Sequence, residues 1–257
     1  MNYQRLNILT IGLVLILVPA NVLHLVPWWS LLLLLLLYLI VLGWGVFDIG
    51  SQFFMPTFWK GKQGEVSFTF DDGPDPEVTP KVLEVLREAN LKAAFFVIGR
   101  NAEKHPELLQ QIIAEGHVGG NHTYNHDYVF SKSAAEKQVA EGQEAIEKVI
   151  GKKPKYFRPP FGVMTPEIAS AIRKEKCAVI GWDLRSQDGR IRTKEATIKR
   201  VKNNLKNATV LLFHDTNPTT PDALREIIHL CRKSGIEIVS IPEQSGIKPY
   251  AQSICHQ

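Results

Sequence analysis

Hydrophobic positions divide the chain into a long apolar N-terminal stretch and a following alternation of short apolar runs with longer amphipathic ones. Residues 6–47 contain no Lys, Arg, Asp or Glu, and seven consecutive leucines occupy 31–37. A single straight helix over 6–47 would be about 63 Å long at ~1.5 Å per residue, about twice the ~30 Å core of a bilayer. The pattern therefore predicts two transmembrane helices, at about 6–26 and 28–47, joined by a short turn.

An alternative for this stretch is a cleaved signal peptide followed by a buried helix. A signal peptide has a short apolar region and a small-residue cleavage site, and nothing before the leucine run fits that description well. A retained hairpin in the cell membrane is thus the preferred interpretation. Its ends carry Arg5, Lys60 and Lys62, whereas its turn has no Lys or Arg. The positive-inside rule favours a cytoplasmic soluble part, although so few charges leave the side open.

The remainder alternates strand-like and helix-like segments, which predicts a parallel sheet covered by helices. Seven strands suit an incomplete or distorted (β/α)7-type barrel better than a regular eightfold one. The predicted strands are 65–70, 93–99, about 117–119, 155–159, 177–182, 208–213 and 236–241. The predicted helices are 76–90, 106–115, 131–150 (with a capping box from Ser133 to Glu136), 165–176, 193–206 and 221–234. The predicted divisions are a hairpin at 1–50, a linker at 51–63, a catalytic domain at 64–245 and a tail at 246–257.

Charge adds little to this picture. The chain has 30 basic and 26 acidic residues, a net charge of +4, which suits a surface near anionic lipid or an anionic glycan without requiring either. No basic stripe interleaved with aromatic residues supports nucleic-acid binding. The sequence predicts neither a nucleic-acid partner nor a protein partner.

Polar residues gather where the predicted strands end. The first strand ends in TFDDGP, the third is followed by GGNHTYNHD, and the fourth ends in RPPFG. The fifth leads into WDLRSQDG, and the sixth ends in LLFHD. Because the carboxyl ends of parallel strands form the active-site rim in α/β folds, these acids, histidines and one arginine predict a single site.

The residue types indicate a metal-assisted hydrolase. His122 and His126 are four apart, a spacing that puts both rings on one side of a helical turn, able to share one ion. Either Asp71 or Asp72 can add the carboxylate of a two-histidine, one-carboxylate zinc site. The other is then free to accept a proton from a metal-bound water.

Three further strand ends complete the predicted machinery. His214, at the end of an apolar strand, is the natural general acid for a leaving group. Arg158 and Asp188 are expected to pair near the base and keep it oriented. The stiff segment 159–162 lies on the rim, where the amide of Phe161 can face a developing oxyanion.

The motifs TFDDGP, HTYNH, RPPFG and LLFHD, in this order, resemble the polysaccharide deacetylases: carbohydrate esterase family 4, the NodB-homology domain. The resemblance covers about 64–241 and leaves the hairpin outside. It implies a distorted (β/α) barrel that removes N-acetyl groups from a glycan with a divalent cation of the zinc type, with Co²⁺, Mn²⁺ or Ni²⁺ as alternatives.

The resemblance also implies roles for individual residues. Asp71 is the implied base, and the implied metal ligands are Asp72, His122 and His126. Arg158 is implied to orient Asp71, His214 to act as general acid, and Leu212 to line the acetyl pocket; Pro159 and Phe161 are assigned to substrate binding. One motif departs, because family members often have Asp-Trp where this chain has Asp188-Gly189. The missing Trp leaves the substrate size and the acyl group in doubt.

The leading hypothesis is a membrane-anchored, metal-dependent carbohydrate N-deacetylase that uses a metal-activated water. A nearer alternative is a deacylase of a lipid-linked sugar at the membrane surface. A more distant one is a membrane-tethered glycan-binding protein with a vestigial site.

Overall fold

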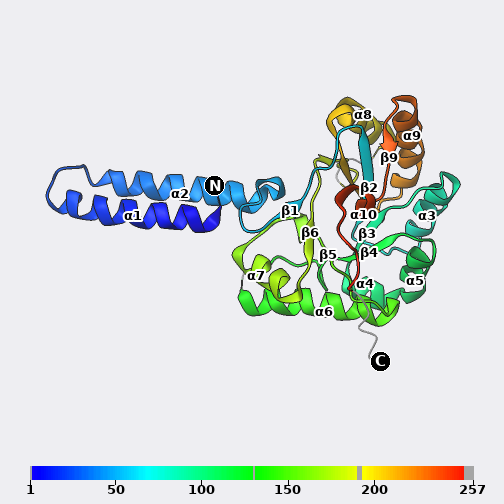
Figure 1. Ribbon diagram of the computed structural model, residues 1–257, viewed down its shortest axis with the longest axis horizontal. Helices are drawn as coiled ribbons and strands as arrows, with labels where there is room; N and C mark the ends of the chain where they lie inside the picture. The colour runs from blue at the N-terminus through cyan, green and yellow to red at the C-terminus, as the bar shows by residue number, and fades with distance from the viewer. Residues whose placement is uncertain (1, 130, 190–192, 252–257) are drawn as a thin grey trace.

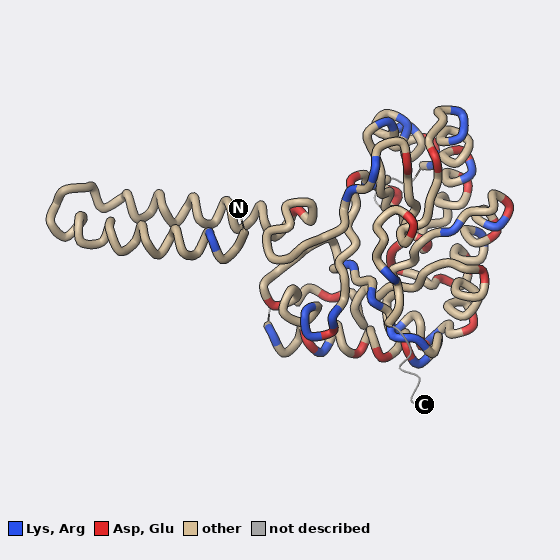
Figure 2. Tube along the Cα trace, viewed as in Figure 1, with Lys and Arg blue, Asp and Glu red and all other residues tan. Residues whose placement is uncertain are grey.

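The computed structural model describes residues 2–129, 131–189 and 193–251, which form a helical hairpin and a globular α/β part (Figure 1). The hairpin consists of α1 (Tyr3–Val22) and α2 (Trp29–Phe47) and projects from the globular part. Both helices are long and apolar enough to cross a membrane, and few of their residues are buried in the structure. Figure 2 shows the contrast: charged residues cover the globular part and are nearly absent from the hairpin.

The base of the hairpin is fixed to the globular part by backbone contacts. The Met164 amide donates a hydrogen bond of 3.0 Å to the carbonyl of Val46, and the Tyr3 amide donates one of 3.0 Å to Phe53. A side chain at Gly45 has no room, because its Cβ would lie 2.2 Å from the Phe53 ring. The end of α2 therefore lies against the segment that follows the predicted RPPFG motif.

The globular part is built on one parallel sheet with the strand order β1-β6-β5-β4-β3-β2-β8-β7, in which β9 also pairs with β2. The strands are β1 (Thr57–Phe58), β2 (Glu65–Asp71), β3 (Ala94–Val97), β4 (Val118–Asn121), β5 (Tyr156–Phe157), β6 (Ala178–Ile180), β7 (Leu184–Arg185), β8 (Val210–His214) and β9 (Glu237–Ile238). The two end strands, β1 and β7, are not paired with each other in the described part of the chain. The sheet is a curled, open barrel, which confirms the predicted fold class.

Helices cover the outside of this sheet. They are α3 (Thr79–Glu88), α4 (Gly99–Lys104), α5 (Pro106–Ala114), α6 (Lys132–Ile150), α7 (Pro166–Glu175), α8 (Lys194–Asn204) and α9 (Thr220–Lys233). The short helix α10 (Ile241–Ser245) packs on the other face, where Ile241 clusters with Phe96 and Ile180. The 3-10 turns are η1 (Ile49–Ser51), η2 (Pro160–Gly162) and η3 (Leu205–Asn207). The largest core cluster includes Phe68, Phe70, Phe95 and Phe213, and the Phe70 ring stacks on Phe95 at 4.9 Å. Burying each such ring contributes roughly 1.5–3 kcal/mol, so β2 and its neighbours form a rigid centre.

The structure differs from the sequence predictions in several places. The segment 51–63, predicted to be a linker, contains β1, and the WDLRSQDG segment contains β7. The predicted capping box at Ser133 is wrong: Ser131 is the N-cap of α6, and its hydroxyl accepts from the Ala134 amide at 3.3 Å. The predicted tail packs on the domain as far as it is described, since the Tyr250 hydroxyl accepts from the Gly119 amide at 2.9 Å. Residues 252–257 of that tail lie outside the described residues.

Candidate active site

The carboxyl ends of the neighbouring strands β2 and β8 place Asp71 and His214 side by side. In the parallel pair β2–β8, Asp71 is in register with His214, the last residues of the two strands. The next residue, Asp72, has a φ of 76°, so the chain turns sharply there. A Cβ on Gly73 would lie 2.0 Å from the Asp215 carboxylate, so this turn requires glycine. The turn brings both carboxylates to one cavity, as predicted from the Gly-Pro that follows them.

Asp72, His122 and His126 form a cluster that can hold a metal ion. Oδ1 of Asp72 lies 3.4 Å from Nε2 of His122 and 3.3 Å from Nε2 of His126. This oxygen is buried and has no hydrogen-bond partner among the described residues. Two ligands of one tetrahedral Zn²⁺ are about 3.3–3.5 Å apart, because Zn–N and Zn–O bonds are about 2.0–2.2 Å long. Both the spacing and the unpartnered oxygen therefore fit a divalent cation.

The tautomer of His122 also suits a metal ligand. Its Nδ1 lies 2.7 Å from the backbone carbonyl of Arg158, which can only accept a hydrogen bond. Nδ1 is thus protonated, and the lone pair of the neutral ring is on Nε2, beside Asp72. A backbone carbonyl of this kind is a common outer-shell partner of metal-bound histidine.

The predicted helical turn under the two histidines is wrong, although their grouping is right. They lie in the loop between β4 and α6, where Thr123 and His126 have φ values of 67° and 64°. The Asn121 side chain accepts from the Thr123 amide at 2.8 Å, and the Thr123 hydroxyl accepts from the His126 amide at 3.1 Å. These bonds bend the loop so that the two ring centroids are 4.8 Å apart.

Arg158 holds Asp71. Its Nη1 donates to Asp71 Oδ1 at 2.7 Å and to the Thr69 hydroxyl at 2.9 Å. Its Nε and Nη2 donate to the carbonyls of Ile180 and Gly181, at 2.9 and 2.8 Å. The guanidinium is fully buried, and every one of these bonds restricts its position. One Asp71 oxygen is thereby fixed, and the other, Oδ2, lies 3.8 Å from His122 Nε2.

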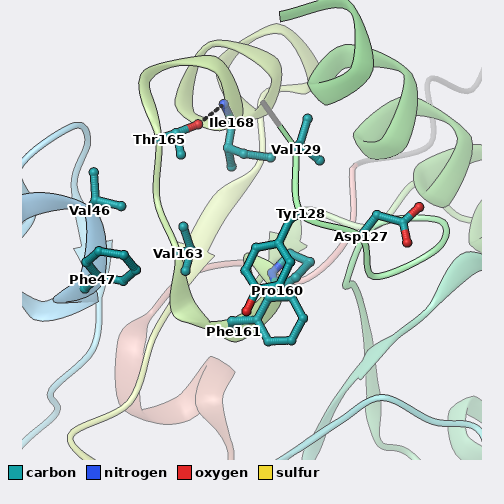
Figure 3. A pocket seen from close by; sticks show the side chains of 10 residues that line it. All are labelled: Val46, Phe47, Asp127, Tyr128, Val129, Pro160, Phe161, Val163, Thr165 and Ile168. Carbon is teal, nitrogen blue, oxygen red and sulfur yellow. Dashed lines mark hydrogen bonds between the residues drawn. The ribbon is translucent and has the colours of Figure 1, made fainter. Parts of the chain in front are cut away.

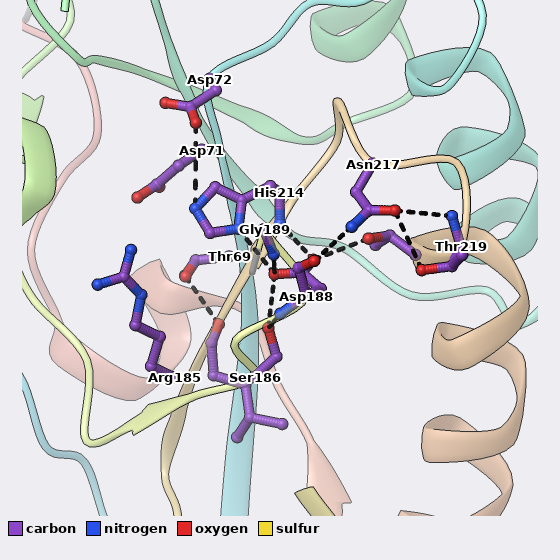
Figure 4. A network of polar contacts seen from close by, with 12 residues as sticks. Thr69, Asp71, Asp72, Arg185, Ser186, Asp188, Gly189, His214, Asn217 and Thr219 are labelled. Atoms are coloured by element: carbon purple, nitrogen blue, oxygen red, sulfur yellow. Dashed lines mark hydrogen bonds and ion pairs between the residues drawn. The ribbon is translucent and has the colours of Figure 1, made fainter. Parts of the chain in front are cut away.

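The predicted pairing of Arg158 with Asp188 is wrong. Asp188 follows β7, on the far side of β8 from β2, and it pairs with His214 instead (Figure 4). Oδ1 of Asp188 lies 2.7 Å from His214 Nδ1, and its Oδ2 accepts from the His214 amide at 2.8 Å and from the Thr220 hydroxyl at 2.7 Å. The order of the strands, which residue spacing does not reveal, decides which acid meets which base.

The pairing sets the protonation of His214. Burial disfavours the charged imidazolium, but the hydrogen bond to Asp188 and its negative charge outweigh burial and raise the pKa of His214 to about 9. Nε2 of His214 lies 4.0 Å from Oδ2 of Asp72. A protonated nitrogen thus faces the metal cluster near neutral pH.

Asp215, the residue after His214, binds the first residue of α3. Its Oδ2 accepts from the Thr79 hydroxyl at 2.6 Å, and burial raises the pKa of this carboxyl to about 7. Asp183 accepts from the amides of Thr209 and Val210 at the start of β8, at 2.9 and 2.8 Å. Both acids therefore support β8 and the β2 turn.

These groups line a cavity of about 370 Å³. Its lining is formed by Asp71, Asp72, His122, His126, Tyr128, Phe161, Gly162, Trp182, Arg185, Gly189, Leu212, His214 and Thr216. Phe161 and Leu212 line it as predicted. Pro159 is buried and is not among these residues; its carbonyl accepts from the Gly162 amide at 3.0 Å, so its contribution is to the turn η2.

Sequence reasoning missed Tyr128, Trp182, Arg185 and Thr216. Trp182 and Arg185 belong to the WDLRSQDG strand end, so their position on the rim was a usable signal. Tyr128 carried none, because it follows the histidine motif in an irregular loop. Its ring stacks on Phe161 at 4.2 Å, and Phe161 meets the His126 ring edge-on at 4.4 Å.

Comparisons with known proteins agree with this geometry. The family model described as polysaccharide deacetylase matches residues 60–180. A peptidoglycan-N-acetylglucosamine deacetylase of Bacillus cereus is 34% identical over 186 residues, which are 70% of this chain and 68% of that protein. A chitooligosaccharide deacetylase of Azorhizobium caulinodans is 32% identical over 168 residues, 64% of this chain and 80% of that protein. The solved structure of peptidoglycan deacetylase PdaC from Bacillus subtilis matches with a TM-score of 0.67 at 33% identity, covering 72% of this chain and 91% of that chain.

Proposed function

Because this chain belongs to the polysaccharide deacetylase family, a family of hydrolases acting on carbon–nitrogen bonds other than peptide bonds, we propose that it is a membrane-anchored, metal-dependent carbohydrate N-deacetylase. The observation that carries the proposal is the arrangement in one cavity of a metal-binding cluster, the Asp71 carboxylate and the His214 imidazole. The substrate is an N-acetylated sugar, the class on which the peptidoglycan and chitooligosaccharide relatives act by name.

The cation would be held by Asp72, His122 and His126, and Zn²⁺ is the first candidate because this donor set of two imidazoles and one carboxylate is common in catalytic zinc sites. When bound, it supplies a Lewis acid that polarises the acetyl carbonyl and lowers the pKa of water. Co²⁺, Mn²⁺ and Ni²⁺ remain alternative occupants.

Asp71 is the proposed general base. Arg158 fixes one of its oxygens, and the other oxygen lies beside the ligands in the cavity. Asp71 Oδ2 accepts the proton of the water that attacks the acetyl carbon. A base in this position contributes typically 10²–10⁴-fold to the rate.

His214 is the proposed general acid. It donates the Nε2 proton to the sugar nitrogen as the carbon–nitrogen bond breaks, while Asp188 holds the other ring nitrogen and stabilises the imidazolium. Two further residues form the proposed pocket for the acetyl group. Leu212 offers an apolar surface, and the amide of Phe161 is the candidate donor to the oxyanion. A glycan-binding protein with a vestigial site would not require this complete set.

The experiment uses the full-length protein and chitin tetrasaccharide, with acetate release as the readout. Release is expected with added Zn²⁺ or Co²⁺. Asp71→Asn should keep metal affinity and lose activity by at least about 10²-fold, whereas His122→Ala should lose the metal. Equal activity of the wild type and Asp71→Asn contradicts the mechanism.

A further inference from the structure

A second cavity, of about 330 Å³, lies beside the active site and is almost entirely apolar (Figure 3). Its lining is formed by Val46, Phe47, Asp127, Tyr128, Val129, Pro160, Phe161, Val163, Thr165 and Ile168. Among these side chains only Asp127 carries a charge, and it is exposed. The cavity thus has the chemistry of a site for a hydrocarbon group rather than for a sugar.

The two cavities share a wall. Tyr128 and Phe161 line both of them, and their rings stack nearly parallel, with an interplanar angle of 12°. Phe161 contacts the His126 ring of the metal cluster, and it lines the apolar cavity together with Val163 and the end of α2. A ligand that crosses this aromatic pair reaches the catalytic groups with one end and the apolar cavity with the other.

The apolar cavity is also continuous with the hairpin. Val46 and Phe47 are the last two residues of α2, and Phe47 is 75% exposed. The bond from the Met164 amide to the Val46 carbonyl holds this end of the helix against the cavity. If the hairpin spans a bilayer, as its length and composition allow, the cavity opens where α2 leaves the membrane.

We propose that this cavity binds the hydrocarbon chain of a lipid-linked N-acetylated sugar, whose sugar occupies the metal cavity. The inference rests on the proposed deacetylase function and names its substrate class. The occupant follows from position: a chain that comes from a bilayer meets Phe47 first and the shared aromatic wall last. Each methylene group buried favours binding by about fourfold, so a few methylene groups suffice for selection.

The first test compares the decyl and methyl glycosides of N-acetylglucosamine as substrates of the full chain in phosphatidylcholine nanodiscs. We expect kcat/KM to be at least tenfold higher for the decyl glycoside. This ratio should fall towards one in Val163→Asp and in Phe47→Ser; the latter is an exposed position where folding is not at risk. Leu25→Ser, an exposed apolar residue in the turn at the far end of the hairpin, is the matched control and should keep the wild-type ratio. A wild-type ratio near one, or the same fall in the control, overturns the proposal.

A second test does not depend on turnover. A decyl glycoside with a diazirine in its chain is photolysed with Asp71→Asn in the same nanodiscs, and labelling is expected at residues 46–47, 127–129 and 160–168. Labelling there without deacetylation by the wild type would reject the proposed function and leave chain binding intact. Deacetylation without labelling there would do the reverse. Labelling by a diazirine phospholipid that the decyl glycoside does not displace would identify a membrane lipid as the occupant and overturn the proposal.

Discussion

Asp188 sets the protonation of His214, although Asp188 itself does not line the active-site cavity. It binds both the ring and the backbone amide of His214, and further bonds come to it from Thr220 and Ser186. The Asp188 carboxylate is buried, and burial raises its pKa. The hydrogen bonds to His214 and the charge of that ring outweigh burial and lower the pKa, so the carboxylate stays ionised. The pair therefore sets both the tautomer and the charge of the proposed acid.

The variant Asp188→Asn should move the alkaline limb of the kcat profile to lower pH. The pKa of His214 is raised to about 9 by Asp188 against the effect of burial, so in the wild type the ring stays protonated up to that region. Without the negative charge the ring loses its proton at lower pH, and kcat at pH 8 should fall at least about tenfold. Asp183→Asn is the control, because Asp183 binds the opposite end of β8. An unshifted alkaline limb in Asp188→Asn would argue against His214 as the acid.

At the residue scale, the sequence predicts which residues form the site better than it predicts which of them pair with each other. The acids, histidines and arginine of the site were predictable because each stands at a strand end or in a specific motif. The partners of Arg158 and Asp188 were not, since two acids and two bases at a common rim allow more than one pairing. Only the strand order, with β8 between β2 and β7, separates Asp188 from Arg158.

His117 offers a pH prediction that is independent of the site. Its ring is buried, and Nδ1 accepts from the Ala93 amide at 3.2 Å, so its role is structural. Burial and then the charge of Lys92 lower the pKa of His117 to about 4, from an ordinary value near 6.5. The unfolded chain therefore binds a proton between these pH values that the folded chain does not.

Stability should consequently fall as the pH drops from about 6.5 to 4, by up to about 3 kcal/mol from this residue. His117→Gln, whose side-chain oxygen can still accept from Ala93, should show a weaker dependence of Tm on pH over this interval. The same exchange at His229, exposed on α9, should leave the dependence as in the wild type. Parallel Tm curves for wild type and His117→Gln would contradict the assignment.

At the scale of elements, the loop from β4 to α6 carries the two histidines and depends on one buried side chain. Asn121 donates to the Val139 carbonyl at 2.9 Å and to Gln143 at 3.2 Å, and it accepts from Thr123 at 2.8 Å. It thus ties the start of the loop to α6. The loop keeps its left-handed residues, Thr123 and His126, because these bonds compensate for their backbone strain.

Asn121→Ala should weaken Zn²⁺ binding by about 10–100-fold, as loss of outer-shell support typically does. The buried Thr123 amide would also lose its acceptor, at a cost of about 1–3 kcal/mol in stability. Affinity is measured by competition with a chromophoric chelator, and Tm gives the stability. Asn125→Ala, in the same loop, is the control. Unchanged affinity in Asn121→Ala would show that the loop does not need this anchor.

Most of the elements that sequence reasoning found lie in apolar runs or in amphipathic segments of several residues. β2, β3 and β8 are apolar runs, and their helices repeat apolar residues on one face, so both were predictable. β1 and β7 have two residues each and fall outside every predicted strand, whereas the equally short β5 and β9 lie inside the predicted runs 155–159 and 236–241. In the structure β1 pairs with β6 and β7 with β8. The histidine loop is beyond pattern reasoning for another reason: its left-handed residues are not glycines.

At the scale of the whole molecule, the base of the hairpin contacts the segment that forms one wall of the catalytic site. The end of α2 contacts the segment after η2, and Phe161 of η2 lines the active-site cavity. A hairpin that spans the membrane would thus hold the site close to the bilayer surface. Which surface determines the substrates within reach: mature wall polymers are outside the cell, whereas lipid-linked precursors are assembled on the cytoplasmic side.

The charges at the hairpin predict a cytoplasmic active site. Arg5, Lys60 and Lys62 flank its open end, and the turn between α1 and α2 has no basic residue, so the positive-inside rule favours both ends being cytoplasmic. Alkaline phosphatase and green fluorescent protein are fused separately to the C-terminus; phosphatase activity reports a C-terminus outside the cell, and fluorescence reports a cytoplasmic one. We expect fluorescence without phosphatase activity. Replacing Arg5, Lys60 and Lys62 by Gln while adding two Lys to the turn should invert the result. Phosphatase activity in the unaltered fusion would put the site outside the cell, in reach of wall polymers, and would remove the charge argument for a lipid-linked substrate.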